Sequence, residues 1–501
     1  MSRHNPRLPT VTPARMLPAM AMTLTGKLWR MLDDKALGAI ADTAMQLVTR
    51  SGARIDHVEM LGMLESAGCR VDHAARRCYF TDTLIGNAVT AFARTPANQD
   101  AAAAPWWGSN FRLSQMGSHP HLVEWPHCRR RLATAQDVRD MAKLAHVADE
   151  FETVGQALTC AQIAPAIEPI WNAVTRFQIT DKPLGGGEVL QPQTIAYLAQ
   201  FGRIYSGRAD NRFMAACDFS IAPLIFGNRG VQCMIEKSRF GVTHLPGTMP
   251  ISGMSAPVTI AGTAAVAVAE LLAGWAIYYV IDPSLPAGGI VASGSLDMRS
   301  SQVCFGSPEA LLQDVATVEV CRRRFNMRVS AAVNYVDCKT PGIRAVYEKM
   351  LPLIAMPIMG HGHLMGDGLL SAGQDYSPVQ HLLELDFLRG IGRFGEGFVV
   401  DDRTLALDVI EQVIRGEHDG FLETDHTMTH FRAEQWYPKW LARSAWAGDA
   451  VEQAAEAEML DAVDAYCRDA IARYEPPAID QDKLGAAQDL LRRAQIELKD
   501  C

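Results

Sequence analysis

A long apolar run lies between Pro257 and Ile281, and Glu270 near its centre is the only charged residue in it. A run of this length is sufficient for a membrane span. Its many Ala and Gly residues, the central glutamate and the lack of a flanking Lys/Arg bias instead predict a helix buried on nearly all sides in a large soluble domain. A glycine-rich loop precedes this helix, and a predicted strand, Gly288 to Ala292, follows it. The pattern is therefore one of strand ends alternating with helices.

The same alternation extends over most of the chain after Thr134, where short apolar runs are followed by polar turns and then by helical periodicity. About eight strands with intervening helices are typical of an α/β fold of the TIM (β/α)8 barrel type. The predicted strands are Phe151–Leu158, Pro183–Val189, Phe213–Ile221, Val242–Leu245, Gly288–Ala292, Val329–Val336, Ile354–Met359 and Asp419–Glu423.

Helical spacing and hairpin signals before Pro96 predict a small α+β module, and two charged helices are predicted near the C-terminus. Between the module and the barrel, periodicity is lost from Ala97 to His127, so this segment is either a surface connection or a lid. The predicted organisation is an irregular arm (1–30), the α+β module with its connecting loop (31–133), a barrel catalytic domain (134–445) and C-terminal helices (446–501).

Composition narrows the function classes. The net charge is −9 and the basic runs are short, which argues against nucleic acid as a main partner. Eleven cysteines without a C-x-x-C pair predict reduced thiols in the cytoplasm. The N-terminal stretch lacks a continuous apolar region followed by a small-residue cleavage site, so we expect an irregular arm and not a signal peptide.

In a barrel, side chains just past the C-terminal ends of the strands form the site. No G-x-x-x-x-G-K-[ST] phosphate loop is present. The candidates at these positions are Gln156, Gly185–Gly187, Asp218, His244, Ser255, Tyr335, His361 with His363, and Glu423 with His426.

Five segments together resemble the trimethylamine methyltransferase family: RRRLATAQDVRDMAKLAHVAD, ISGMSAPVTIAGT, LDMRSSQVCFGSPEA, DCKTPG and FLETDHTMTHFRAEQWYPKW. The resemblance implies a barrel enzyme that takes a methyl group from a methylated amine and passes it to cob(I)alamin on a separate corrinoid protein. No D-x-H-x-x-G cobalamin motif occurs in this chain. Accordingly, the resemblance implies no tightly bound cofactor here and a corrinoid protein as partner.

Founding members of this family use pyrrolysine, whereas this sequence contains only standard residues. The chain thus resembles the branch without pyrrolysine, in which quaternary amines such as glycine betaine are substrates. Such an ammonium expels a neutral amine when its methyl group is attacked, so no acid or covalent adduct is required. Glycine betaine, carnitine, proline betaine and a sulfonium all remain open as substrates.

A cation without N–H groups is held best by aromatic faces and a carboxylate. The aromatic candidates are Trp106, Trp107, Phe305, Tyr335 and Tyr376, each of which could equally be a packing residue. We expect Asp218 or Glu423 to supply the carboxylate, and Gln156, Ser255 and His426 to make further substrate contacts.

The pair His361 and His363 departs from the family pattern and permits three readings. It could bind zinc, with Asp367 as a third ligand and help from His244 or His426. It could hold a betaine carboxylate, or it could consist of two unrelated histidines. We place His361, His363, Asp218 and Glu423 as catalytic candidates.

Two competing functions stay open beside the methyltransferase: a zinc-dependent barrel enzyme built on the histidine pair, and a non-catalytic betaine-binding scaffold. We also expect a homo-oligomer, because the predicted terminal helices have exposed faces.

Overall fold

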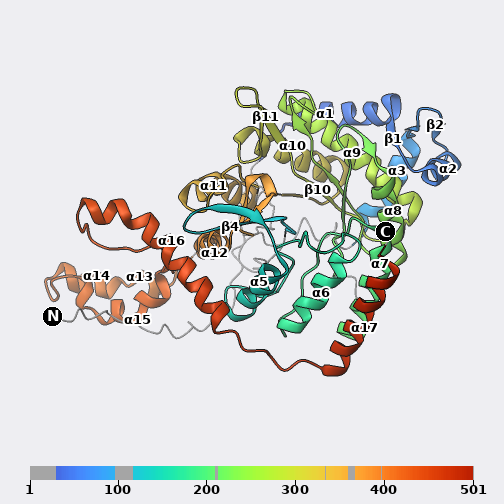
Figure 1. The fold of residues 1–501 in the computed structure, drawn as a ribbon. Helices are drawn as coiled ribbons and strands as arrows, with labels where there is room; N and C mark the ends of the chain where they lie inside the picture. Colours follow the sequence, from blue (N-terminus) through green and yellow to red (C-terminus); the bar gives the residue numbers. More distant parts are fainter. Residues whose placement is uncertain are drawn as a thin grey trace.

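The computed structural model describes residues 30–95, 117–208, 213–332, 335–358, 367–395 and 398–499. The architecture is mixed α/β, and the helices from α5 (Ala135–Val147) to α12 (Pro378–Gly395) follow one another around a central region that contains short strands (Figure 1). Most of these strands pair in parallel and are followed by a helix.

The N-terminal elements are helices and a hairpin, as the helical spacing and hairpin signals before Pro96 predict. Side chains begin two of the helices: Asp33 accepts a hydrogen bond from the backbone N–H of Ala36, and Thr81 from that of Leu84. The module joins the rest of the protein through a parallel pairing of β1 with β7 (Ile225–Phe226). Its elements are α1 (Asp34–Gln46), a π-helical turn (Leu47–Ser51), β1 (Ala53–Ile55), α2 (Val58–Ser66), β2 (Arg70–Asp72), β3 (Arg77–Tyr79) and α3 (Asp82–Ala93).

The apolar run forms helix α9 (Ile260–Ile281). Among the described residues it is the one helix long and apolar enough to cross a membrane, and most of it is buried inside the protein. Glu270 is buried in its middle, where its carboxylate accepts hydrogen bonds from Ser220 Oγ (2.9 Å), Thr248 Oγ1 (2.5 Å) and the N–H of Leu224 (2.7 Å). These contacts satisfy a charge that would otherwise be costly to bury.

Helix α9 packs against the N-terminal module and α10 (Pro308–Phe325), and one apolar core joins these elements. The prediction of a buried helix is confirmed.

Four parallel strands form the clearest sheet, in the order β13 (Val329–Ala331), β10 (Gly289–Val291), β8 (Leu245–Thr248) and β6 (Cys217–Phe219). All four overlap predicted strands. The predicted strands at 151–158 and 183–189 appear as single parallel bridges, Val154 with Leu184 and Gly187 with Met214.

Residues 336–338 follow β13 in the chain, and two backbone hydrogen bonds link them to residues 371–372: Ala372 N to Val336 O (2.7 Å) and Ser371 N to Cys338 O (2.9 Å). Next come β14 (Leu369–Leu370) and β15 (Asp375–Tyr376), and β15 pairs in parallel with β4 (His121–Glu124). Just before β4, His119 makes a parallel bridge to Leu158.

Two predicted strands are wrong. Ile354–Met359 lies, as far as the structure describes it, in helix α11 (Ile343–Ile358), because its apolar residues continue a helical spacing in which Leu353 and Met356 are buried. Asp419–Glu423 forms a bend and a short 3-10 turn (Phe421–Glu423) without a neighbouring strand. A short apolar window does not by itself distinguish a strand from part of a helix.

Short strands and the remaining helices complete the fold. Helix α17 packs beside α6 and α7, while α16 packs on α5 and α12 (Figure 1). The elements are β5 (Arg129–Leu132), α5 (Ala135–Val147), α6 (Glu168–Ile179), α7 (Pro192–Ser206), α8 (Asn228–Arg239), β9 (Ile251–Ser252), β11 (Gly294–Asp297), β12 (Gln302–Cys304), a 3-10 turn (Ser371–Gly373), α12 (Pro378–Gly395), α13 (Asp402–Leu405), α14 (Leu407–Ile414), α15 (Asp425–Glu434), α16 (Asp449–Ala472) and α17 (Gln481–Glu497).

The segment from residue 398 to residue 446, which we call the arm, contains α13, α14 and α15, and these three helices stand away from the other helices (Figure 1, lower left). Trp436 and Lys439, which follow them, contact α12. These three helices have no buried side chains. The arm exposes many large apolar residues, among them Phe398, Leu407, Ile414, Phe421, Leu422, Met428 and Trp446.

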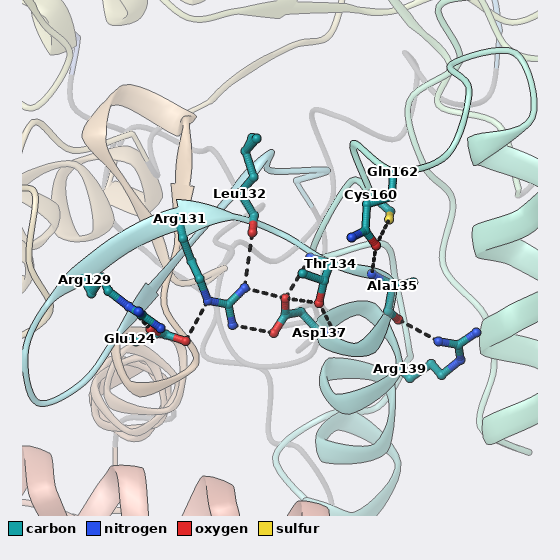
Figure 2. Close-up of polar contacts among 10 residues, drawn as sticks. All are labelled: Glu124, Arg129, Arg131, Leu132, Thr134, Ala135, Asp137, Arg139, Cys160 and Gln162. Atoms are coloured by element: carbon teal, nitrogen blue, oxygen red, sulfur yellow. Dashed lines mark hydrogen bonds and ion pairs between the residues drawn. The ribbon is translucent and has the colours of Figure 1, made fainter.

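The first of the quoted segments, RRRLATAQDVRDMAK, attaches the β4–β5 hairpin to α5 (Figure 2). The Arg131 guanidinium donates two hydrogen bonds to Asp137 (2.6 and 2.8 Å) and one to Glu124 (2.7 Å). Thr134 and Asp137 cap the helix reciprocally, each side chain accepting a hydrogen bond from the other residue's backbone N–H. This motif therefore has a structural role.

Candidate functional site

Two predicted aromatic residues lie together. The ring centroids of Phe305 and Tyr335 are 5.2 Å apart with 33° between the ring planes. We call them the aromatic pair. Gly373, with φ at +86°, lies against Tyr335, and a Cβ atom there would be 2.5 Å from a carbon of the tyrosine ring. Glycine at this position thus allows the backbone to support the ring.

The loops that bear the aromatic pair are joined by carboxylates. Asp337 accepts hydrogen bonds from the N–H groups of Phe305 (3.0 Å) and Gly306 (3.3 Å). Glu348 of α11 in turn accepts from the N–H groups of Asp337 (2.6 Å) and Cys338 (3.2 Å). The segments LDMRSSQVCFGSPEA and DCKTPG, which are separate in the sequence, therefore meet here.

A small pocket lies beside the aromatic pair. Ser293 and Ala332 in its wall lie just past β10 and β13, so it is at the C-terminal ends of parallel strands. The lining residues are Ser293, Phe305, Gly306, Ser307, Leu311, Asp314, Ala332, Tyr335, Leu351 and Pro352.

Asp314 is the acidic residue in this wall. Its side chain is buried and accepts a hydrogen bond from the N–H of Ser293 (2.8 Å). Burial raises the pKa of Asp314 to about 7, because a charged carboxylate loses its hydration there. A buried carboxylate of this kind is stabilised when a cation binds beside it.

Sequence reasoning missed Glu188, which follows Gly185–Gly187 directly. The surrounding protein partly desolvates its carboxylate and raises its pKa, although the side chain is exposed to solvent; the charge of Lys237 acts in the opposite direction. Burial raises the pKa of Tyr335, and the nearby charge of Glu188 raises it further. The signal in the sequence is a charged residue inside the predicted strand Pro183–Val189, directly after three glycines.

Gln156 lies close to this region but its amide is already in use. It is buried and donates to both carboxylate oxygens of Glu168 (3.3 and 3.1 Å), which also accepts from Asn172 Nδ2 (3.1 Å). Gly187 is packed so tightly on Gln156 that a Cβ atom would overlap the amide oxygen. The geometry gives Gln156 a supporting position against Gly187, the residue before Glu188.

Asp218 is paired within the protein. One oxygen is 2.8 Å from Lys237 Nζ on α8, and the other accepts a hydrogen bond from the Tyr278 hydroxyl on α9 (2.6 Å). The carboxylate predicted to be catalytic is thus bound to residues of two surrounding helices.

The remaining described candidates lie elsewhere. Ser255 accepts a hydrogen bond from the N–H of Ile251 (2.9 Å) within its own loop. Glu423 is exposed on the arm. His426 lies one helical turn from His430, with ring centroids 4.5 Å apart.

Trp106, Trp107, His361 and His363 lie outside the described residues. Asp367, proposed as a third metal ligand, is buried 3.7 Å from Lys349 Nζ, which also pairs with Glu384 (2.5 Å). His244 precedes β8, at the opposite end of the strands from the pocket, where burial lowers its pKa to about 4. Within the described ranges, no group of three or more His, Cys, Asp or Glu residues is arranged to hold a metal ion.

Comparison with known proteins identifies the class. The family model described as trimethylamine methyltransferase (MTTB) matches residues 4–498. The chain therefore belongs to this family, as its motifs predict, and is a methyltransferase.

Two curated relatives represent the family. The chain is 24% identical over 413 residues to trimethylamine methyltransferase MttB of Desulfitobacterium hafniense (strain DSM 10664 / DCB-2), and the match covers 80% of this chain and 82% of that protein. It is 23% identical over 469 residues to glycine betaine methyltransferase of D. hafniense (strain Y51), and this match covers 91% of this chain and 95% of that protein. Among solved structures, the Methanosarcina barkeri monomethylamine methyltransferase MtmB has a TM-score of 0.43 at 13% identity, covering 89% of this chain and 95% of that one.

Proposed function

We propose that this methyltransferase removes a methyl group from a small quaternary amine of the glycine betaine type and passes it to cob(I)alamin on a separate corrinoid protein. The observation that supports this most is an aromatic pair with the carboxylate of Asp314 beside it, in a member of a family whose relatives are named for trimethylamine and glycine betaine. An aromatic face with a nearby carboxylate suits a cation that has no N–H group to donate.

The transfer needs no proton. The carbon–nitrogen bond breaks, its electron pair stays on nitrogen, and a neutral tertiary amine leaves. The carbon–cobalt bond forms with the electron pair that cob(I)alamin brings. The protein's contribution is then to hold the methyl group in line with the cobalt and to exclude water.

The fold proposed for this chemistry is a (β/α)8 barrel whose C-terminal face bears the pocket. Parallel pairings support it, because they pass from β4 through the segments at 154, 184 and 214 to β6, β8, β10 and β13. Two backbone hydrogen bonds then link residues 336–338 to residues 371–372, which lie between β14 and β15, and β15 pairs in parallel with β4. In barrels of this type, active sites lie at the C-terminal ends of the strands.

The partners follow from the reaction. We propose that the corrinoid protein docks over the mouth of this barrel, and that the enzyme needs no cofactor of its own, nucleic acid or membrane. The cysteines within the described residues are all free, which is consistent with a cytoplasmic location. The exposed apolar arm supports a homo-oligomer.

The direct test is a single-turnover reaction with reduced corrinoid protein, this enzyme and a panel of methylated amines. We expect the cob(I)alamin absorbance to be replaced by that of methyl-cobalamin with at least one quaternary amine. If no amine reacts with an active, reduced partner, the proposal fails. Catalytic roles for His361, His363, Asp218 and Glu423, and the zinc alternative, would then be examined by metal analysis of the purified protein.

A further inference from the structure

The turn Ser371–Gly373 packs against Tyr335 with a strained backbone. Its three residues have left-handed φ angles, +51° at Ser371, +55° at Ala372 and +86° at Gly373. Residues with a Cβ atom disfavour this region, so the surrounding structure must hold them in it. Atoms Cε1 and Cδ1 of the Tyr335 ring would be 2.5 and 3.1 Å from a Cβ atom on Gly373. The backbone of the turn therefore limits where the ring can lie.

The imidazole of His119 bonds to this turn. Its Nδ1 atom lies 2.8 Å from the carbonyl oxygen of Gly373, and because a carbonyl only accepts, Nδ1 carries the proton and donates it. His119 is buried, and its ring stacks on that of Tyr376 with 11° between the ring planes. The hydrogen bond and the stacking together set the orientation of the imidazole.

The backbone of His119 is anchored independently of the turn. Its N–H donates to the carbonyl of Ala157 (3.0 Å), and its own carbonyl accepts from the N–H of Thr159 (2.9 Å). Two residues further along both segments, β4 pairs in parallel with β15. The imidazole thus ties the strained turn to the start of β4 and to the neighbouring segment 157–159.

We infer that His119 is a positioning residue for the proposed methyl transfer. It holds the turn against Tyr335 and so sets the place of the aromatic face that receives the ammonium group. The inference rests on the proposed function for its ligand, whereas the contacts among His119, Gly373 and Tyr335 are those of the protein itself. A cation is attracted to a ring when it lies over the face within about 6 Å of the centroid, so a displaced ring binds it less well.

Two variants of His119 differ from each other mainly in this hydrogen bond. Asparagine carries an N–H group at the same number of bonds from the backbone as Nδ1, and leucine has the same branched shape without a donor. His119→Asn should therefore keep the turn in place, and His119→Leu should release it.

The position of the ring is measured without any ligand, by fluorine NMR of the full-length protein labelled with 3-fluorotyrosine at its 11 tyrosines. The label occupies a Cε position, and Cε1 is the ring atom nearest to a Cβ atom on Gly373. Tyr335→Phe identifies the signal of Tyr335 by its loss. We expect His119→Leu to shift or broaden this signal and His119→Asn to keep it.

The consequence for the ligand is measured by isothermal titration calorimetry with glycine betaine. We expect His119→Leu to raise the dissociation constant roughly fivefold or more, and His119→Asn to change it less than about twofold. If a different quaternary amine reacts in the single-turnover panel, that amine replaces glycine betaine in the titration.

Gly373→Ala displaces the same ring by a second route, because the added Cβ atom would overlap it. Gly68→Ala is the matched control: its φ is +91°, so it brings similar backbone strain, but its chain neighbours aside no atom lies within 4 Å of the added Cβ atom. We expect Gly373→Ala to move the Tyr335 signal and weaken binding, and Gly68→Ala to change neither.

The outcomes separate this inference from the proposed function. An unchanged Tyr335 signal or dissociation constant in His119→Leu overturns the inference, as do equal effects of leucine and asparagine, and the methyl transfer of the wild type is untouched by that result. A role in stability alone would give such an outcome, with a lower free energy of unfolding in urea. A moved signal without binding or transfer of any amine supports the placement of the ring by His119 and contradicts the proposed function.

Discussion

Asp314 shows at the residue scale how a binding group is held at a cost to stability. Its pKa is about 7 in the folded protein against 3.8 for an ordinary aspartate, because burial disfavours the charged form. A raised pKa means that its contribution to stability is complete below pH 3.8 and is lost as pH rises through 7. The full shift corresponds to at most about 4 kcal/mol.

Asp314→Asn should remove this pH dependence. Relative to the wild type, the variant should gain stability between pH 5.5 and pH 8.5, measured as the free energy of unfolding in urea. Asp419→Asn, at an exposed position on the arm, is the control. The same slope in the wild type and in Asp314→Asn would contradict a raised pKa.

The aromatic pair gives a second prediction at this scale. Replacing Tyr335 by Ala removes one face of the proposed cation site, which is worth about 1–2 kcal/mol, so KM for the amine should rise roughly 5- to 30-fold. Tyr335→Phe keeps the face and should change KM less than threefold. Phe398→Ala, where the ring is 82% exposed, should leave KM unchanged. Equal effects of Ala and Phe at position 335 would point to the hydroxyl group instead of the ring.

At the scale of the element, the Thr134 capping box begins α5 and Arg131 ties that helix to the β4–β5 hairpin. Thr134→Ala should lower the free energy of unfolding by about 1 kcal/mol because a helix N–H loses its partner. Thr134→Ser keeps the oxygen and should retain most of the stability. Matching losses in the two variants would show that the methyl group, and not the cap, is what matters.

Elements with their own local signals were predictable from sequence. Caps such as Thr81 and Thr134 and the long apolar run of α9 are encoded locally, so the corresponding helices were found. Strands depend on neighbours that are remote in sequence, which is why 354–359 and 419–423 were assigned incorrectly. For the site, Phe305 and Tyr335 were named, but their contact, and that of Asp314 with the pocket, depends on how α10 and the strand ends pack.

At the scale of the whole molecule, the arm is the feature that a monomer does not explain. Its helices bury no side chain, while Ile414 and Leu422 are 77% and 83% exposed. Apolar surface of this extent favours a lasting interface, because partners that separate in every reaction cycle meet through more polar surfaces. We therefore expect the arm to pack against a second copy of the chain.

The double variant Ile414→Glu/Leu422→Glu should lower the molar mass measured by light scattering at micromolar concentration, since it places charges in an apolar contact. Ile496→Glu, at a 76% exposed position on α17, is a matched control that should keep the wild-type mass. A wild-type monomer, or an unchanged mass in the double variant, would contradict self-association through the arm. Because no residue of the arm lines the pocket, the dissociated variant should still bind the amine.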